Sequence, residues 1–223
     1  MNENIFRRVV QTILTLVLQS VILFISAGTY RWIWAWIFVV TGVVILVINF
    51  MVLPQEVIEE RGRKKGNVKK WDKILTTISI LPLLGIYIIS GLDYRFNWSG
   101  DLQISINIIG IVLSFLGSMI FTWSMVSNRY FSTMVRIQEE RGHQVAVEGP
   151  YKYVRHPGYV GYIIMVISTP LALASLYALI MSLMVSAIFI IRTALEDKTL
   201  SIELDGYEEY SKKVRYRLIP FIW

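Results

Sequence analysis

Apolar runs of about membrane-spanning length alternate with short polar segments along the chain. The first run covers residues 9–28, and a second continues to residue 53 after a turn marked by Trp32, Trp34 and Trp36. A helix of about 20 apolar residues crosses a hydrocarbon core about 30 Å thick, and tryptophans gather at membrane interfaces. We therefore expect two membrane-spanning helices here, and not a cleaved signal peptide.

Two further apolar runs, residues 74–92 and 104–126, predict a third and a fourth span, joined by an outer loop that is poor in cations. Pro82 falls inside the third span, where neighbouring helices can satisfy the carbonyl that a proline leaves free. Small residues follow one face of the fourth span, at Gly110, Ser114, Gly117 and Ser118. This spacing is typical of close helix packing, with a cofactor groove as the alternative.

Residues 159–192 are apolar throughout, which is too long for one span and just long enough for two short ones. The run therefore predicts a tight helical hairpin with its turn near residues 174–177. Such a hairpin returns residues 192–204 to the membrane face from which it started. Together the runs predict an all-α integral membrane protein with about six transmembrane helices, of which the last two form the hairpin.

Positive charge is concentrated in two polar segments, residues 54–73 and 128–156, within a chain that is 55% hydrophobic and has a formal net charge of +6. Lysine and arginine in short loops favour the cytoplasmic side, so both segments and the N- and C-termini are expected there. The cations of the first segment could alternatively form a patch for an anionic lipid or an anionic substrate. Such clusters beside apolar runs indicate membrane lipids as partners, and no nucleic acid.

Composition excludes several kinds of chemistry. The chain has no cysteine, so disulfides, thiolate metal sites and cysteine nucleophiles are excluded. Its two histidines, His143 and His156, lack a metal-binding pattern around them, and no metal is expected. Glycine-rich dinucleotide fingerprints, phosphate-binding loops and the nucleophile elbow are also missing. A nucleotide-like cofactor must therefore be held in another way.

One polar and aromatic stretch, residues 149–161, runs directly into the hairpin and is the first candidate for a site. Pro157 suits the first turn of a helix and pushes His156 into an extended conformation, which presents Arg155 and His156 at the helix mouth. The glycines that follow leave room for a backbone or a ligand. The alternative is an ordinary loop that caps a membrane helix with interfacial arginine and tyrosine.

A second polar element ends the hairpin. Arg192 and Glu196 lie four residues apart and Glu203 lies seven further on, so a continuing helix places them on one face. Ionisable groups at membrane depth are costly and favour a functional role, although a solvated helix end with ion pairs has the same pattern. We therefore divide the chain into four amino-terminal spans that pack and bind substrate, residues 1–127, and a catalytic part, residues 128–223.

These elements resemble the isoprenylcysteine carboxyl methyltransferase family, which forms a wider group with the phospholipid N-methyltransferases. The resemblance covers about residues 131–223 and rests on the order and spacing of four blocks: Gly149-Pro150-Tyr151, Val154-Arg155-His156-Pro157 with Tyr159 and Gly161, the acidic pair Glu196-Asp197, and Tyr207-x-x-Tyr210 followed by Val214-Arg215-Tyr216-Arg217-Leu218-Ile219-Pro220. The first three spans carry no motif that supports it.

The resemblance implies S-adenosylmethionine as the methyl donor and S-adenosylhomocysteine as the product. It implies a cofactor pocket formed by the loop and the last two helices, with candidate residues Gln138, Val147, Gly149, Tyr151, His156, Pro157, Tyr159, Gly161, Glu196 and Asp197. The family usually has two glutamates at the acidic pair, so Asp197 departs from its pattern by a shorter arm. The catalytic candidates are Arg155, Arg192 and Glu196, and the substrate-binding candidates are Arg192, Tyr207, Tyr210 and Arg215.

A methyl sulfonium is already activated, so its transfer needs mainly alignment, exclusion of water and placement of charge. An arginine fork would hold a carboxylate acceptor, whereas Glu196 or Glu203 would take the proton of an amine acceptor. The resemblance favours a lipidic or prenylated substrate, and in it the carboxylate of a prenylcysteine-like or other apolar molecule. Three other interpretations stay open: methylation of a phospholipid or another amine, an NADPH-dependent sterol-type reductase, and a membrane protein without enzymatic activity.

Overall fold

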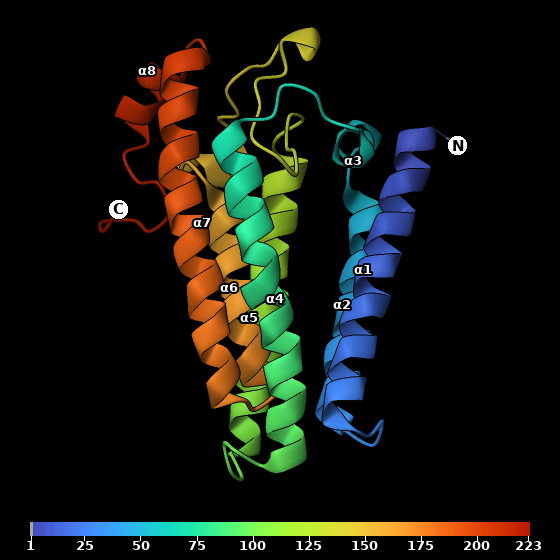
Figure 1. Ribbon diagram of the computed structural model, residues 1–223. Helices are drawn as coiled ribbons and strands as arrows, with labels where there is room; N and C mark the ends of the chain where they lie inside the picture. Colours follow the sequence, from blue (N-terminus) through green and yellow to red (C-terminus); the bar gives the residue numbers. More distant parts are fainter. Residues whose placement is uncertain (1) are drawn as a thin grey trace.

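A computed structural model describes residues 2–223, and within this range every regular element is helical (Figure 1). Five helices are long and apolar enough to cross a membrane: α1 (Glu3–Ala27), α2 (Ile33–Val52), α4 (Lys70–Phe96), α5 (Ile104–Val126) and α7 (Leu176–Glu203). The shorter elements are α3 (Gln55–Gly62), α6 (Pro157–Ala172), α8 (Tyr207–Lys213) and two 3₁₀ turns, Glu139–Arg141 and Gly149–Lys152. The prediction of an all-α integral membrane protein is confirmed.

The predicted hairpin is formed by α6 and α7, which are joined by a short turn at residues 173–175. α6 is apolar but has only 16 residues, so five helices, and not six, reach spanning length within residues 2–223. α7 continues through Arg192 to Glu203 without a break, as the polar face at its end predicts. The polar segment 54–73 contains α3, where the sequence indicated only a charged loop.

The small residues of α5 pack against α6, as their spacing predicts. A Cβ on Gly161 would lie 2.5 Å from the Gly117 carbonyl oxygen, and a Cβ on Gly110 would lie 2.1 Å from the Ala172 nitrogen. The two helices therefore meet backbone to backbone, which requires glycine at these positions. Asn107 adds a buried hydrogen bond of 2.9 Å to the Ala172 carbonyl. This contact fixes the position of α6, whose amino-terminal end carries the candidate motif.

α4, α5, α6 and α7 form one group, and α1 and α2 lie along its side (Figure 1). α3, α8 and the segment between α5 and α6 gather at the end where α1 begins (Figure 1). At the opposite end, Asp93 joins two turns by accepting hydrogen bonds from Ser99 (2.7 and 2.6 Å) and from the Ser175 hydroxyl (2.5 Å). The segments that sequence analysis selected for chemistry therefore lie together at one end of the protein.

Candidate active site

A cavity of about 350 Å³ lies at this end, between α4, α6, α7 and the segment 128–156. Apolar and aromatic side chains form much of its wall, including Leu83, Phe121, Phe131, Tyr162 and Phe189. Nine of the sequence candidates line it: Gln138, Tyr151, Arg155, His156, Tyr159, Arg192, Glu196, Tyr207 and Tyr210. The cavity is therefore amphipathic, with several charged groups against apolar walls.

Asp197 is buried and does not itself line the cavity, but it contacts side chains from three other parts of the chain. We call Asp197 and these partners the hub. Its Oδ1 accepts a hydrogen bond from the Tyr207 hydroxyl (2.8 Å) and lies 3.2 Å from Nε2 of His156. Its Oδ2 accepts a hydrogen bond from Nε of Arg217 (2.8 Å). Nε of Arg155 lies 3.2 Å from Oδ1 as an ion pair. Both oxygens of Asp197 are thus engaged by protein groups, which hold the loop, α7, α8 and the carboxyl-terminal tail together.

Glu196, one residue earlier on α7, lines the cavity. The Tyr159 hydroxyl donates a hydrogen bond to its Oε2, and the Tyr159 ring stacks on His156 with 5.8 Å between the ring centroids. Its Oε1 accepts no hydrogen bond from any residue between 2 and 223. Glu196 is therefore a positioned carboxylate with one oxygen left for a ligand.

Arg192 lines the cavity from the same helix and is held by Asp72 at the start of α4. Its Nε donates to Oδ1 of Asp72 (2.6 Å), and its Nη2 donates to Oδ2 of Asp72 (3.3 Å) and to the Thr133 carbonyl (3.2 Å). The guanidinium also lies over the Tyr159 ring, 5.3 Å from its centroid. Its Nη1 makes no hydrogen bond within the described chain, so one donor edge stays free.

Arg155 brings a second guanidinium to the cavity, with its side chain only 9% exposed. Its Nε pairs with Asp197 by distance, but the two groups are not aligned for a hydrogen bond. Its terminal nitrogens have no hydrogen-bond partner among residues 2–223. Because these terminal nitrogens are free donors on a guanidinium, Arg155 can also receive a carboxylate in the cavity.

Hydrogen bonds to the backbone and to Arg141 position residues of the loop before α6 and of α8. Gln138 is buried in the cavity wall, where its Nε2 donates to the Tyr130 carbonyl (2.6 Å) and its Oε1 accepts from Nη1 of Arg141 (2.6 Å). The Tyr210 hydroxyl donates to the Tyr151 carbonyl over 2.7 Å. Burial raises the pKa of Tyr151 and Tyr210, so both phenols stay neutral. These three candidate residues all line the cavity.

Other sequence candidates lie outside the cavity lining. Gly161 packs against α5, and Gly149 has a positive φ of 59° in a position where a Cβ would lie 2.2 Å from Oγ of Ser127. Val147 is 47% exposed, Arg215 is also exposed, and Pro157 is buried at the first position of α6. The structure thus brings part of the candidate set together around one cavity and gives the rest positions in packing or at the surface.

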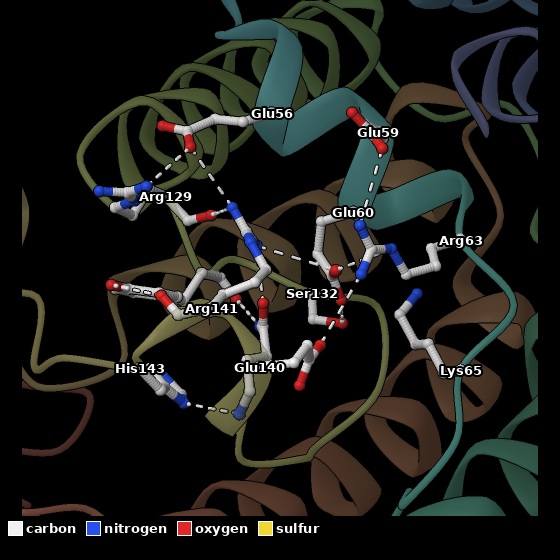
Figure 2. Close-up of polar contacts among 12 residues, drawn as sticks. Glu56, Glu59, Glu60, Arg63, Lys65, Arg129, Ser132, Glu140, Arg141 and His143 are labelled. Carbon is white, nitrogen blue, oxygen red and sulfur yellow. Dashed lines mark hydrogen bonds and ion pairs between the residues drawn. The ribbon is translucent and has the colours of Figure 1, made fainter. Parts of the chain in front are cut away.

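Ion pairs attach the loop to α3 (Figure 2). Glu60 of α3 is 1% exposed and accepts hydrogen bonds from Nη2 of Arg136 (2.9 and 3.1 Å) and from the Ser132 hydroxyl (3.2 Å). Arg129 and Arg141 pair with Glu56, one turn earlier, at 3.3 and 3.4 Å. These contacts hold one wall of the cavity against the rest of the protein.

Sequence analysis did not select Asp72 or Glu60 as site residues. Each is an acidic residue inside a segment dominated by lysine and arginine, which the positive charge alone assigns to topology. A carboxylate next to an apolar span is costly to bury without a partner, and this cost is the signal that could have identified both.

A match to the Isoprenylcysteine carboxyl methyltransferase (ICMT) family covers residues 108–202. A probable protein-S-isoprenylcysteine O-methyltransferase of Oryza sativa subsp. indica is 32% identical over 121 residues, which are 52% of this chain and 62% of the relative. The protein-S-isoprenylcysteine O-methyltransferase of Schizosaccharomyces pombe is 35% identical over 102 residues, 44% of this chain and 43% of that protein. A Delta(14)-sterol reductase of Mus musculus is 35% identical over 86 residues, but these are only 20% of its length.

The matched part of the chain thus spans less than two thirds of the length of each of these relatives. The match begins inside α5 and ends near the end of α7, so it contains the loop, the hairpin and most of the groups that line the cavity. Residues 108–202 are thus similar to the isoprenylcysteine carboxyl methyltransferase family.

Proposed function

We propose that this protein transfers a methyl group from S-adenosylmethionine to the carboxylate of a prenylcysteine-like acceptor at the cytoplasmic face of the membrane. The observation that carries the proposal is the amphipathic cavity, in which positioned charged groups from the family's motifs meet an apolar wall. An acceptor with a prenyl chain and a carboxylate matches this cavity, because the chain suits the apolar wall and the carboxylate suits the cationic groups. The names of the relatives support this choice of acceptor.

The residues at the cavity fit the cofactor. S-adenosylmethionine, when bound, would supply a methyl group on a positively charged sulfur. Glu196 has a free Oε1 that can accept a hydrogen bond from an ammonium or hydroxyl group, and its negative charge favours a cation nearby. His156 and Tyr159 stack on each other and extend the polar wall beside it. We assign Glu196, His156 and Tyr159 to cofactor binding.

Two guanidiniums are suited to hold the acceptor carboxylate. Arg192 is oriented by Asp72 and keeps Nη1 free, while Arg155 keeps its terminal nitrogens free. Neither residue needs to move a proton, because a carboxylate is already the nucleophile at neutral pH. Their work is to orient the acceptor and to offset its charge, while the aromatic walls exclude water from the reacting groups.

The proposed orientation follows from charge. The end that carries the cavity also carries α3 and the loop 128–148, with most of the clustered lysines and arginines, whereas the opposite turns are poor in cations. By the positive-inside rule this end faces the cytoplasm. A water-soluble cofactor would then enter from the cytosol, and a prenylated acceptor would enter from the bilayer.

Calorimetric titration with S-adenosylhomocysteine tests the cofactor assignment. The purified full-length protein in detergent is expected to bind S-adenosylhomocysteine, and Glu196→Gln is expected to weaken binding at least tenfold, because a hydrogen bond to a charged group contributes about 1.5–3 kcal/mol. Glu209→Gln, at an exposed position of α8, is the matched control. Binding of NADPH in place of S-adenosylhomocysteine would refute the proposal and favour the reductase-like alternative that the sterol reductase match raises.

A further inference from the structure

A second cavity, of about 660 Å³, lies between α1, α3 and the connection from α3 to α4. It adjoins the first cavity, because Arg61, Thr133 and Met134 line both. Five cations line it, and no carboxylate does: Arg8, Arg61, Arg63, Lys65 and Lys73. We call these five residues the cationic pocket. None of the residues assigned above to the cofactor or to the acceptor belongs to it.

Three of these cations have no polar side-chain partner within residues 2–223. Arg8, Arg61 and Lys73 make neither an ion pair nor a side-chain hydrogen bond with any residue between 2 and 223. Arg61 is partly buried, and its guanidinium lies over the rings of Phe121 (5.5 Å) and Phe131 (5.4 Å). The described residues thus gather three cations here without an ion-pair partner for any of them.

The other two cations are held more firmly. Arg63 pairs with Glu59 at 3.6 Å and with Glu140 at 3.8 Å (Figure 2). Lys65 donates to the Thr133 hydroxyl over 2.6 Å but has no carboxylate within ion-pair distance in the described chain. Burial lowers the pKa of Lys65 to about 8, with Glu60 opposing the shift and nearby arginines adding to it. Burial and the charge of Arg8 lower the pKa of Arg61 to about 9. An anion in the pocket would relieve this repulsion.

Tight packing builds the pocket. α3 contacts the first turn of α1 at Gly62, where a Cβ would lie 1.9 Å from the Asn4 carbonyl oxygen. Nη1 of Arg7 donates to the Gly62 carbonyl over 3.4 Å. This approach brings Arg61 of α3 to Arg8 of α1, although both carry the same charge. The packing of α3 against α1, and not the flexibility of surface side chains, therefore brings the two arginines together.

The side chains around the cationic pocket favour a membrane lipid as its ligand. Leu14 lines the pocket about 9 Å further along α1 than Arg8, at the helical rise of 1.5 Å per residue. From Leu14 a stripe of exposed apolar side chains continues along α1 through Leu18 and Val21 to Ile25. Arg8 thus lies where a spanning helix leaves the hydrocarbon core, which is the depth of lipid phosphates.

We propose that the cationic pocket binds the phosphate of an anionic membrane phospholipid, whose acyl chains lie along the exposed apolar stripe of α1. Arg8, Arg61 and Lys65 would donate to the phosphate oxygens, and Lys73 would add charge at the rim. This site is separate from the proposed methyl-transfer site and does not depend on it. A free phosphate ion carries the same negative charge but has no acyl chain that could contact the apolar stripe.

Native mass spectrometry of the full-length protein tests the proposal. The protein in detergent is titrated with phosphatidylglycerol, with phosphatidylcholine or with inorganic phosphate. We expect phosphatidylglycerol to bind at least tenfold more tightly than phosphatidylcholine, and millimolar inorganic phosphate to leave it bound. Arg8→Gln and Lys65→Gln should each weaken phosphatidylglycerol binding about tenfold, since each removes a charged hydrogen-bond donor.

Matched controls separate the pocket from general surface charge. Lys64→Gln removes an exposed lysine next to Lys65, and Lys70→Gln removes an exposed lysine at the start of α4, outside the pocket lining. Both should change phosphatidylglycerol binding less than twofold. Equal losses in the control and pocket variants, or displacement of the lipid by inorganic phosphate, would overturn the proposal. If Arg8→Gln fails to fold by circular dichroism, Lys65→Gln, at a position outside the helices, decides the outcome.

Discussion

Replacement of Asp72 by asparagine should destabilise the protein strongly. Asp72 is fully buried and accepts three hydrogen bonds through its two oxygens, from Nε and Nη2 of Arg192 and from the Val135 backbone nitrogen (2.7 Å). The carboxamide that Asp72→Asn introduces would present an N–H group to one of these donors and would leave a guanidinium that is only 9% exposed without its counter-charge. Loss of one partner of a buried ion pair costs about 3–5 kcal/mol.

Thermal unfolding measures this loss. The chain has seven tryptophans, so the transition of the detergent-solubilised protein can be followed by intrinsic fluorescence. At about 2–4 °C per kcal/mol for a chain of this size, Asp72→Asn should lower the Tm by about 6–20 °C. The exposed Asp205→Asn serves as the control and should shift it by less than about 2 °C.

A double variant tests the cause. Addition of Arg192→Met to Asp72→Asn should restore at least half of the lost stability, because no unpaired guanidinium then stays buried. A decrease of less than about 2 °C in Asp72→Asn, or additive losses in the double variant, would refute the view that this pair couples α4 to α7.

Three further outcomes follow from the same structure. Gly161→Leu should lower stability by at least about 1–3 kcal/mol in thermal unfolding, because its Cβ would meet the Gly117 carbonyl oxygen at 2.5 Å, whereas Gly66→Ala, with nothing within 4 Å, should change little. Tyr159→Phe should weaken S-adenosylhomocysteine binding about tenfold in calorimetry by releasing Glu196, whereas Tyr153→Phe at a 66% exposed position should not. Burial lowers the pKa of His143 from 6.5 to about 4, so the unfolded chain binds the extra proton between these values. The contribution of His143 to stability should therefore fall by about 1–2 kcal/mol as the pH falls from 6.5 to 4 and stay constant above 6.5. The difference in stability between the original protein and His143→Gln, measured across this pH range, isolates that contribution.

Periodicity and length predicted the helices well, because spans follow from local composition. The fourth span coincides with α5 at residues 104–126, and the small residues on its face meet α6 as their spacing indicates. The hairpin follows from the length of one apolar run, and it brings His156 and Glu196 to the same end of the protein. α3 was not predicted, because the cations around it obscured a short amphipathic helix.

The sequence pattern could not predict which residues of the site pair with one another. Asp72 and Arg192 are 120 residues apart, and no periodic signal links them. Glu196 and Asp197 form a pair in sequence, but adjacent residues on a helix point about 100° apart. Glu196 therefore lines the cavity while Asp197 faces the hub of His156 and Tyr207. Only the packing of α7 against the loop and α8 decides which of the two lines the cavity.

The most direct test of the proposed function is transfer of a labelled methyl group. The protein, reconstituted in vesicles, is incubated with methyl-labelled S-adenosylmethionine and either N-acetyl-S-farnesylcysteine, its carboxamide, or phosphatidylethanolamine. We expect a base-labile methyl ester with the carboxylate acceptor alone. Arg192→Gln should lower the rate at least a hundredfold, whereas Arg31→Gln, in the exposed turn between α1 and α2, should leave it unchanged. Methylation of the amine lipid, or no transfer to the carboxylate, would contradict the proposed function.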